Sequence, residues 1–341
     1  MARIGIVGAT SWGTTLGIVA ARNGSEVRLL ARSKDEADGL QASRENPRFL
    51  PGAMFPDSMR VESSPSEALA GADVVIIAVP SRTMRDNVRA IRECLEENAV
   101  LLSASKGLEI SSGKRMSQVL AEELPKSLHG RICALSGPNL AGEIIQGKPS
   151  STVVASKNLE AARAAQAALT SNRFRVYTNT DIVGVELGGA LKNIIALGAG
   201  ICDGLDVGDN AKAAFMTRGL AEIARLGVAA GAEAITMAGL AGMGDLIATC
   251  SSPLSRNHYV GVELAKGRTL KEIRNSMKNI AEGVDTTAAA VEMAARLRVD
   301  LPIARVTYRV LFEDLPIGQA IAELMGRPPS PEWSGIEAEG R

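Results

Sequence analysis

The first half of the chain alternates short apolar runs with stretches in which apolar positions recur at helical spacing. The apolar runs are continuous, which is typical of parallel strands covered on both faces. They predict strands at residues 3–7, 26–31, 73–79, 99–103, 131–136 and 152–155. The helical spacing predicts helices at residues 12–23, 34–45, 82–93 and 113–124. This alternation predicts an α/β domain built on a doubly wound parallel sheet.

The pattern changes after residue 179, where Ala-rich helical spacing replaces the apolar runs. It predicts helices at residues 183–203, 211–230, 260–266, 286–297 and 304–312, and no strand. The last segment is rich in Pro, Gly and acidic residues, as loose tails are. We therefore predict an α/β domain over residues 1–180, an all-helical domain over residues 181–326 and a flexible tail over residues 327–341.

The composition of the 341-residue chain favours a globular protein of a reducing compartment. Its 38 basic and 38 acidic residues cancel, so its charge gives no reason to expect a nucleic-acid partner. The four cysteines show no CxxC spacing and there are only two histidines, which predicts free thiols and no metal site. No apolar run approaches the roughly 18 residues of a membrane span. The chain also begins directly with a strand, so we expect a cytoplasmic protein without membrane insertion.

The first predicted strand ends in a glycine-containing turn that opens a helix. In the GxGxxG fingerprint, the glycines permit a tight turn, close approach of a pyrophosphate and close helix packing. Gly8 and Gly13 fill the first and third positions, but Thr10 stands at the second. Its side chain is expected to widen the loop or weaken its hold on the phosphates. The context still favours a Rossmann-type dinucleotide site over a plain strand–helix turn.

The end of the second predicted strand bears on the choice of cofactor. NAD-binding domains usually place an acidic residue there to hold the ribose hydroxyls. Here the strand ends with Arg32 and Ser33, and no acid follows before Asp35. A guanidinium and a hydroxyl suit a 2′-phosphate, so NADP is favoured over NAD. A solvated arginine at a strand end is the alternative interpretation.

Three further strand ends carry residues suited to ligand binding. They are Pro80-Ser81, Lys106 in the segment SASKGLE, and Gly137-Pro138-Asn139. Because ligands of open α/β sheets bind outside the carboxyl ends of the strands, the three segments are predicted to form one rim. Each segment alone is also compatible with ordinary loop chemistry.

Two ionisable residues interrupt apolar stretches of the helical half. Lys192 lies in VELGGALKN, where small neighbours allow a ligand to approach closely. Such surroundings disfavour the charged amine and suit an acid/base catalyst, although a snorkelling lysine is the alternative. Asp245 in AGMGDLIATC is expected to orient Lys192 or a substrate hydroxyl, or simply to cap a helix.

The segment Ser255-Arg256-Asn257 predicts another helix start. Serine, arginine and asparagine at a helix N-terminus suit an oxyanion or a phosphate. The adjacent His258 is predicted to be a bystander, because the sequence shows no partner that would orient it as a base.

Taken together, these motifs resemble those of the bacterial-type NAD(P)-dependent glycerol-3-phosphate dehydrogenases. The likeness is carried by VELGGALKN, GDNAKAA, TRGLAEIARLG and AGMGDLIATCSSPLSRN, with NPRFLPG, SKGLE and LSGPN upstream. The resemblance implies a Rossmann domain followed by an all-helical domain, with substrate bound between them. It also implies reversible reduction of dihydroxyacetone phosphate to sn-glycerol 3-phosphate by NAD(P)H, which supplies the glycerophospholipid backbone.

The resemblance also implies roles for residues at matching positions. The implied catalytic residues are Lys192, as acid/base, Lys106 and Asp245. The implied substrate contacts are Lys106, Gly137, Asn139, Lys192, Asp245, Ser255, Arg256 and Asn257. The implied cofactor contacts are Gly8, Ser11, Trp12, Gly13, Arg32, Ser33, Lys106, Ala141, Arg256, Ile280 and Glu282. Two positions depart from the family pattern, since Thr10 replaces a Gly and Asn139 replaces a Ser or Thr.

Two alternatives share parts of this pattern. A 2-hydroxy-acid or ketopantoate-type reductase would keep the fold but would bind a carboxylate in place of a phosphate. A silent NADP-binding regulator would keep the dinucleotide site but would have no use for Lys192, Asp245 and Arg256 together. The Ala- and Gly-rich helices also offer a face for a homodimer, a question that the sequence leaves open.

Overall fold

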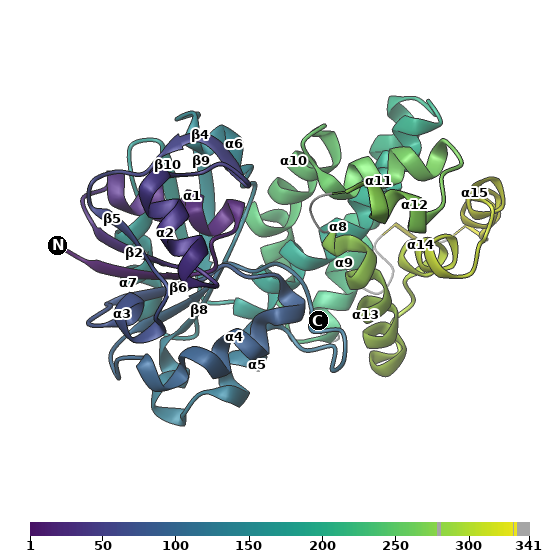
Figure 1. Cartoon of the computed structure of the whole chain (residues 1–341). Coiled ribbons are helices and arrows are strands. Elements are labelled where there is room, and N and C mark those ends of the chain that lie inside the picture. Colours follow the sequence, from purple (N-terminus) through teal and green to yellow (C-terminus); the bar gives the residue numbers. More distant parts are fainter. Residues whose placement is uncertain (278–280, 330, 333–341) are drawn as a thin grey trace. The chain divides into compact units, whose positions relative to one another are not determined.

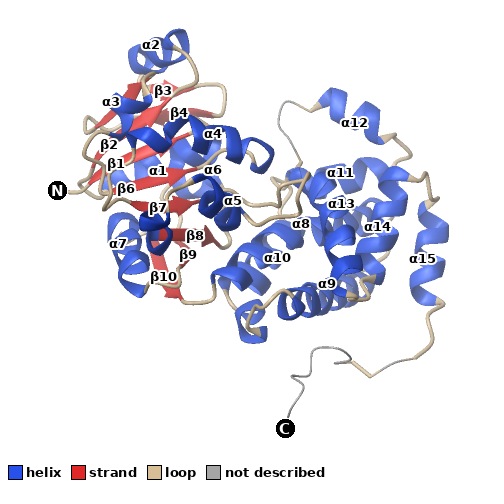
Figure 2. Ribbon diagram, turned by 90° about the horizontal axis from the view of Figure 1, so that it is seen from below, coloured by secondary structure: helices blue, strands red, loops and turns tan. Residues whose placement is uncertain are grey.

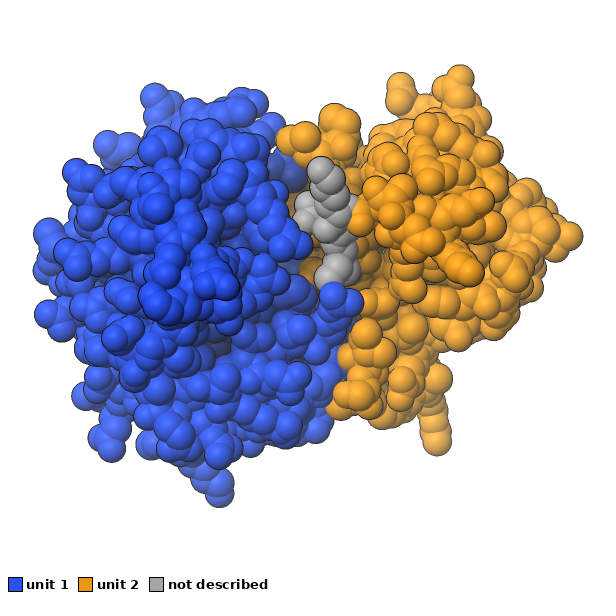
Figure 3. All heavy atoms as spheres, in the orientation of Figure 1, with its two compact units in different colours: residues 1–109, 114–182 blue, residues 110–113, 183–341 orange. Residues whose placement is uncertain are grey.

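The computed structural model describes residues 1–277, 281–329 and 331–332 of the chain. They form two compact units (Figures 1 and 3). Unit 1 comprises residues 1–109 and 114–182, and unit 2 comprises residues 110–113 and 183–341. The short segment 110–113 thus groups with the helical unit, although it lies within the predicted α/β domain. Of the predicted tail, residues 330 and 333–341 lie outside the described residues.

Unit 1 is built on an eight-stranded sheet with helices packed against it (Figure 2). Its strands are β1 (Arg3–Val7), β2 (Glu26–Leu30), β5 (Met59–Glu62), β6 (Val74–Ile77), β7 (Val100–Ser103), β8 (Ile132–Ser136), β9 (Ser150–Ala155) and β10 (Phe174–Asn179). They lie in the order β10-β9-β8-β7-β6-β1-β2-β5. From β5 to β8 this is the strand order of a Rossmann fold, which confirms the predicted fold class.

The sheet is not parallel throughout, which corrects one expectation. β8 and β9 pair antiparallel, with Leu135 opposite Val154, whereas β9 and β10 pair parallel with each other. A buried strand has the same continuous apolar pattern in either direction, so the sequence alone could not reveal this reversal. A separate small hairpin joins β3 (Glu45–Asn46) to β4 (Leu50–Met54).

The centre of the sheet is buried on both faces, as the continuous apolar runs predict. Every residue of β6, β7 and β8 is buried. The helices of this unit are α1 (Ser11–Arg22), α2 (Lys34–Ser43), α3 (Pro65–Leu69), α4 (Met84–Ile91), α5 (Met116–Glu123), α6 (Ala141–Ile145) and α7 (Leu159–Leu169). Side chains of α1 and α7 share one hydrophobic cluster with the strands, so the sheet fixes the positions of the loops at its edge.

The described residues of unit 2 form helices and connecting loops, without a strand. The helices are α8 (Ile182–Gly204), α9 (Asp209–Ala229), α10 (Asp245–Ser251), α11 (Arg256–Ala265), α12 (Leu270–Ser276), α13 (Glu282–Leu297), α14 (Pro302–Phe312) and α15 (Ile317–Met325). A short π-helical turn, Leu240–Gly244, leads into α10.

Helix α8 is the longest helix among the described residues of unit 2. By length and composition alone it could cross a membrane, contrary to the expectation that no segment is apolar enough, but 89% of its most apolar window is buried inside the protein. Its glycines allow close packing: a Cβ added at Gly200 would lie 2.0 Å from the carbonyl oxygen of His258 on α11. Such burial is typical of a core helix.

Candidate active site

The turn after β1 has the backbone geometry of a phosphate-binding loop. Gly8 has a φ of +110°, and an added Cβ would lie 2.9 Å from the carbonyl oxygen of Ala78. A Cβ added at Gly13 would lie 2.1 Å from the carbonyl oxygen of Gly8, so both positions require glycine. The turn runs directly into α1, and the N-terminus of a helix offers N–H groups and a favourable dipole to a phosphate. The residues present therefore fit a dinucleotide.

Thr10 has a structural role in this turn. It is the N-cap of α1, and its Oγ1 accepts a hydrogen bond from the N–H of Gly13 at 3.0 Å. The same hydroxyl donates to the carbonyl oxygen of Ala78 at 2.8 Å. Thr10 thus joins the start of α1 to the end of β6 and occupies the N–H of Gly13. The N–H groups of Ser11 and Trp12 also lie in the first turn of α1, where the helix provides no carbonyl to accept them, so they are the donors suited to a phosphate.

Asn46, which is not among the predicted site residues, supports the glycine turn. Its side chain is only 2% exposed. Its Nδ2 donates to the carbonyl oxygen of Ala9 at 3.0 Å and to Oγ1 of Thr14 at 2.9 Å. Because a peptide carbonyl and the following N–H point in opposite directions, holding the Ala9 carbonyl also orients the N–H of Thr10. The NPRFLPG motif therefore contributes a support for the turn.

Arg32 forms an ion pair with Glu36, which is not among the predicted site residues. Its Nη2 lies 2.6 Å from Oε1 of Glu36, and its Nε donates to Oε2 at 3.1 Å. Oε2 also accepts the backbone N–H of Arg32 at 2.9 Å. Ser33 is the N-cap of α2, and its hydroxyl accepts the N–H of Glu36 at 3.2 Å. Both residues predicted to hold a 2′-phosphate therefore contact Glu36.

The carboxyl ends of three neighbouring strands meet at one edge of the sheet, as the rim hypothesis expects. Nζ of Lys106, which follows β7, donates to the carbonyl oxygen of Gly137 beyond β8 at 2.9 Å. The hydroxyl of Ser105 donates to the carbonyl oxygen of Val79 beyond β6. Gly137 has a φ of +145°, and a Cβ there would lie 3.0 Å from Cα of Thr152. Lys106 is thereby aligned along this edge.

A charged network fixes the segment that follows Lys106. The Arg85 guanidinium on α4 binds the buried Glu109 carboxylate through two hydrogen bonds of 2.8 Å. Arg85 also contacts Glu122 and Glu123 of α5. Three carboxylates around one guanidinium hold the pKa of Arg85 above its usual range, led by the hydrogen bond to Glu109. The network ties the Lys106 segment to α4 and α5.

The remaining predicted contacts of unit 1 lie around the same edge. Oδ1 of Asn139 accepts from the hydroxyl of Thr152 at 2.9 Å, so this side chain is bonded to β9. Ala141 is the first residue of α6. The ring of Trp12 packs edge-on against Phe174, with centroids 6.5 Å apart. Nε1 of Trp12 is buried and has no hydrogen-bond partner among the described residues.

Unit 2 holds a buried lysine–aspartate centre. Lys192 lies in the middle of α8, and its Nζ is 2.8 Å from Oδ1 of Asp245, the first residue of α10. Nζ also donates to the hydroxyl of Thr249, and this hydroxyl donates to the same Asp245 oxygen at 3.2 Å. Lys192 is 6% exposed and Asp245 is 2% exposed. Asp245 does not cap its helix, and Lys192 does not snorkel to the surface.

Small residues make this centre possible. Gly188 lies one turn before Lys192, and a Cβ there would lie 2.7 Å from the carbonyl oxygen of Ala241. The backbone of α8 therefore approaches the π-helical turn closely, and this brings Asp245 to Lys192. Thr249 follows Asp245 at i+4 on α10, the spacing that places two side chains on one helix face. Thr249 is not among the predicted site residues, although this spacing could have identified it.

The start of α11 has the predicted capping geometry. The buried Ser255 is the N-cap, and its hydroxyl accepts the N–H of His258 at 3.2 Å. Arg256 opens the helix with an exposed side chain. Oδ1 of Asn257 accepts the N–H of Gly283 at 2.9 Å, which joins α11 to the start of α13, where Glu282 is the first residue. The predicted cofactor contact Ile280 lies outside the described residues.

His258 has a partner that its sequence position did not reveal. Its Nε2 lies 2.6 Å from Oδ2 of Asp203 at the end of α8. Nζ of Lys212 on α9 contacts the same oxygen at 2.7 Å. The Asp203 carboxylate thus joins α8, α9 and α11, and His258 has a structural role in this contact.

The cysteines and the metal-binding residue types suggest no further reactive centre in the part of the chain that the structure describes. All four cysteines are free. Burial raises the pKa of the Cys133 thiol to about 11 and that of Cys250 to about 12, so both stay protonated at neutral pH. Within the described ranges, no group of three or more His, Cys, Asp and Glu side chains is placed to hold a metal ion.

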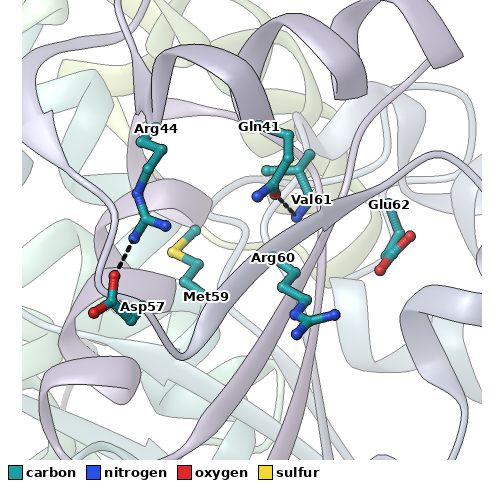
Figure 4. A pocket seen from close by; sticks show the side chains of 7 residues that line it. All are labelled: Gln41, Arg44, Asp57, Met59, Arg60, Val61 and Glu62. Atoms are coloured by element: carbon teal, nitrogen blue, oxygen red, sulfur yellow. Dashed lines mark hydrogen bonds and ion pairs between the residues drawn. The ribbon is translucent and has the colours of Figure 1, made fainter.

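A separate pocket of about 390 Å³ lies at the α2–β5 edge of unit 1 (Figure 4). Arg44 points toward Asp57 across it, with Nη2 and Oδ1 2.9 Å apart. Gln41 accepts the N–H of Val61, which occupies part of this sheet edge. Its lining residues are Gln41, Arg44, Asp57, Met59, Arg60, Val61 and Glu62, and none of them is a predicted site residue.

A Rossmann sheet with a glycine turn, together with a helical unit that buries a lysine–aspartate pair, defines a class: the NAD(P)-dependent dehydrogenases of small molecules. Residues 3–162 match the family described as "NAD-dependent glycerol-3-phosphate dehydrogenase N-terminus", and residues 181–322 match its C-terminus. The chain belongs to this family of NAD-dependent glycerol-3-phosphate dehydrogenases.

Individual relatives agree with this assignment. The chain is 52% identical to a "Glycerol-3-phosphate dehydrogenase [NAD(P)+]" of Dehalococcoides mccartyi, over 98% of this chain and 94% of the relative. It is 48% identical to one of Chlorobium chlorochromatii, over 96% and 99%. The crystal structure of glycerol-3-phosphate dehydrogenase from Coxiella burnetii matches with a TM-score of 0.89 and 36% identity, covering 96% of this chain and 99% of that one.

More distant structures share the fold alone. A ketopantoate reductase from Ralstonia eutropha matches with a TM-score of 0.56 and 18% identity, over 91% of this chain and 97% of its own. The ketopantoate-type alternative is therefore not favoured.

Proposed function

We propose that the chain reduces dihydroxyacetone phosphate to sn-glycerol 3-phosphate with NAD(P)H, reversibly, and that Lys192 is the acid/base. The observation that carries this proposal is the buried contact of 2.8 Å between Nζ of Lys192 and Oδ1 of Asp245. Burying a charged pair is costly, because each ion loses its hydration. At the centre of an enzyme unit, such a pair is a candidate catalytic site.

Lys192 supplies the proton that the reaction needs. When bound, the nicotinamide supplies the hydride for the substrate carbonyl. The Lys192 ammonium donates a hydrogen bond to the carbonyl oxygen, stabilises the negative charge that develops there and transfers its proton. Asp245 and Thr249 hold Nζ in place while this occurs. In the reverse direction the amine takes the proton from the hydroxyl group.

The substrate phosphate and the cofactor are assigned to charged or N–H-bearing groups. Arg256 and the helix start capped by Ser255 are suited to the substrate phosphate, since a guanidinium forms paired hydrogen bonds to phosphate oxygens. Asn257 completes this segment. Lys106 is assigned to both substrate and cofactor, and Gly137 and Asn139, at the same edge of the sheet, are assigned to the substrate. Remote binding of the phosphate positions the carbonyl and contributes to the rate.

The dinucleotide is assigned to unit 1. The N–H groups of Ser11 and Trp12, beside Gly8 and Gly13, would hold its pyrophosphate. Arg32 and Ser33 would hold a 2′-phosphate, which favours NADP over NAD, and Ala141 lines the same edge. Glu282 is assigned to the cofactor from unit 2. We expect Arg32→Ala to raise the KM for NADPH far more than the KM for NADH; equal effects would refute the preference.

The reaction is tested by following the loss of NADPH absorbance after adding dihydroxyacetone phosphate, with NADH and a 2-keto acid run in parallel. Rapid loss with dihydroxyacetone phosphate alone is the expected result. Turnover of the 2-keto acid instead would favour the carboxylate-binding alternative. Binding of NADPH without any turnover would favour the silent regulator.

Two properties of the whole protein are also proposed. A cytoplasmic location is supported by the four free cysteines, and cell fractionation tests it. A homodimer is supported by the Ala- and Gly-rich helices. The molar mass from size-exclusion chromatography with light scattering tests it. A monomer mass across the working concentration range would refute the dimer.

A further inference from the structure

Glu36 contacts the residues at the strand end where the second ribose of a dinucleotide would be recognised. It lies in the first turn of α2, and its partner Arg32 follows β2, the strand whose end reads the ribose 2′ substituent in Rossmann domains. Its carboxylate binds the side chain and the backbone N–H of Arg32. Its own N–H donates to the hydroxyl of Ser33. One residue therefore contacts both groups assigned to a 2′-phosphate.

We propose that Glu36 is a specificity-determining residue that sets the balance between NADP(H) and NAD(H). A 2′-phosphate must displace the Glu36 carboxylate from Arg32 or share the guanidinium with it, and the two anions repel each other. A ribose 2′-hydroxyl is neutral and can donate to that carboxylate, as it does to the acidic residue of NAD-binding domains. The inference rests on the proposed dinucleotide site and deepens it.

The geometry makes this competition specific to one face of the guanidinium. The carboxylate takes Nε and Nη2, the pair that forms a two-pronged contact with an oxyanion. The Arg32 side chain is 67% exposed, whereas that of Glu36 is 21% exposed, so the arginine is the more accessible partner. The hydrogen bond from Arg32 lowers the pKa of Glu36, which keeps the carboxylate ionised at neutral pH.

The same helix provides a matched control. Lys34 and Asp38 form a second i,i+4 pair on α2, with Nζ and Oδ2 3.0 Å apart and both side chains exposed. Asp38→Asn changes the charge of α2 by the same amount as Glu36→Gln but leaves Arg32 with its partner. A general electrostatic effect would appear in both variants, whereas competition for Arg32 would appear only in Glu36→Gln.

The experiment measures binding of two cofactor fragments by calorimetry: adenosine 2′,5′-bisphosphate, which carries the 2′-phosphate, and ADP, which lacks it. We expect Glu36→Gln to bind the bisphosphate about tenfold more tightly, which corresponds to one charge-assisted hydrogen bond, with little change in the affinity for ADP. Asp38→Asn should change neither by more than about twofold. Titration of intact NADPH and NADH by their fluorescence should show the same pattern.

Three outcomes would overturn the inference. Equal gains in Glu36→Gln and Asp38→Asn would assign the effect to overall charge. An equal loss of affinity for both fragments in Glu36→Gln would mean that Glu36 only maintains the loop. Failure of the wild type to bind either fragment would refute the dinucleotide site itself, and the inference with it.

Discussion

Nζ of Lys192 lies 2.8 Å from Oδ1 of Asp245, although the two residues are 53 positions apart in the chain. Both side chains are almost fully buried. Each charge therefore depends on the other, since a lone buried ion would be left without hydration or a counterion. The hydroxyl of Thr249 contacts both groups and completes the centre.

Removing the amine should separate the catalytic and structural roles of this pair. Lys192→Met keeps an unbranched side chain but leaves the buried Asp245 without its cation. We expect a loss of about 3–5 kcal/mol of unfolding free energy, as for other broken buried pairs. Turnover should fall about 100- to 10,000-fold, which is the usual contribution of a positioned acid/base. Urea unfolding and NADPH oxidation measure the two effects.

A double variant is the control for this prediction. Lys192→Met combined with Asp245→Asn removes both charges and should recover much of the lost stability while the enzyme stays inactive. Recovery of turnover in the double variant, or normal turnover in Lys192→Met, would contradict the acid/base assignment.

Glu222 should make the stability of unit 2 depend on pH. This residue of α9 is 4% exposed, and its carboxylate accepts the N–H groups of Ile303 and Ala304 at the start of α14. Burial raises the pKa of Glu222 from 4.5 to about 7, with the two N–H groups and Arg225 opposing the shift and Asp300 adding to it. The native state thus holds this proton more tightly than the unfolded chain.

The sign of the effect follows from that difference. The contribution of Glu222 is fully present below the unfolded pKa of 4.5 and is lost as pH rises through about 7. The slope between these values should reach about 1.4 kcal/mol per pH unit at most. Glu222→Gln should flatten urea-derived stability over this window, whereas Glu292→Gln, on the exposed face of α13, should leave the slope unchanged. An unchanged slope in Glu222→Gln would contradict the prediction.

The sequence predicted the central strands well because burial on both faces leaves a continuous apolar run. It missed β5 and β10, where buried and exposed residues alternate near the ends of the sheet. Their short alternating patterns do not differ clearly from those of loops. The reversal between β8 and β9 was also missed, because strand direction depends on the connection and not on apolar content.

The same contrast holds for the candidate site. Glycine positions such as Gly8 and Gly13 could be predicted, since a backbone requirement is written in the residue itself. Glu36 stands four residues after Arg32, a spacing that could have identified it as a partner. Asn46 could not be identified, because its importance arises from a contact with Ala9, 37 positions earlier in the chain, and a polar residue carries no sign in the sequence of which distant carbonyl it will meet.

The hydroxyl of Thr10 should matter more than its methyl group. Thr10→Val keeps the shape but leaves the N–H of Gly13 and the carbonyl of Ala78 without this partner. We expect a loss of about 1–2 kcal/mol in urea unfolding, as for other removed N-caps, and weaker NADPH binding. Thr10→Ser retains the hydroxyl and should stay close to wild type. If Thr10→Ser were as destabilised as Thr10→Val, the hydroxyl would not be the cause.

Asn46 should affect cofactor affinity without touching the cofactor. Asn46→Ala removes the donor that holds the buried carbonyl of Ala9, which should cost about 1–3 kcal/mol of stability. Because the glycine turn loses its support, the KM for NADPH should rise several-fold while kcat changes little. Asn87→Ala is the control, since Asn87 also donates its amide to a backbone carbonyl, but to that of Thr83 at the start of α4 and not to a residue of the glycine turn. Equal increases in KM for the two variants would show that the effect comes from general destabilisation and not from support of the turn.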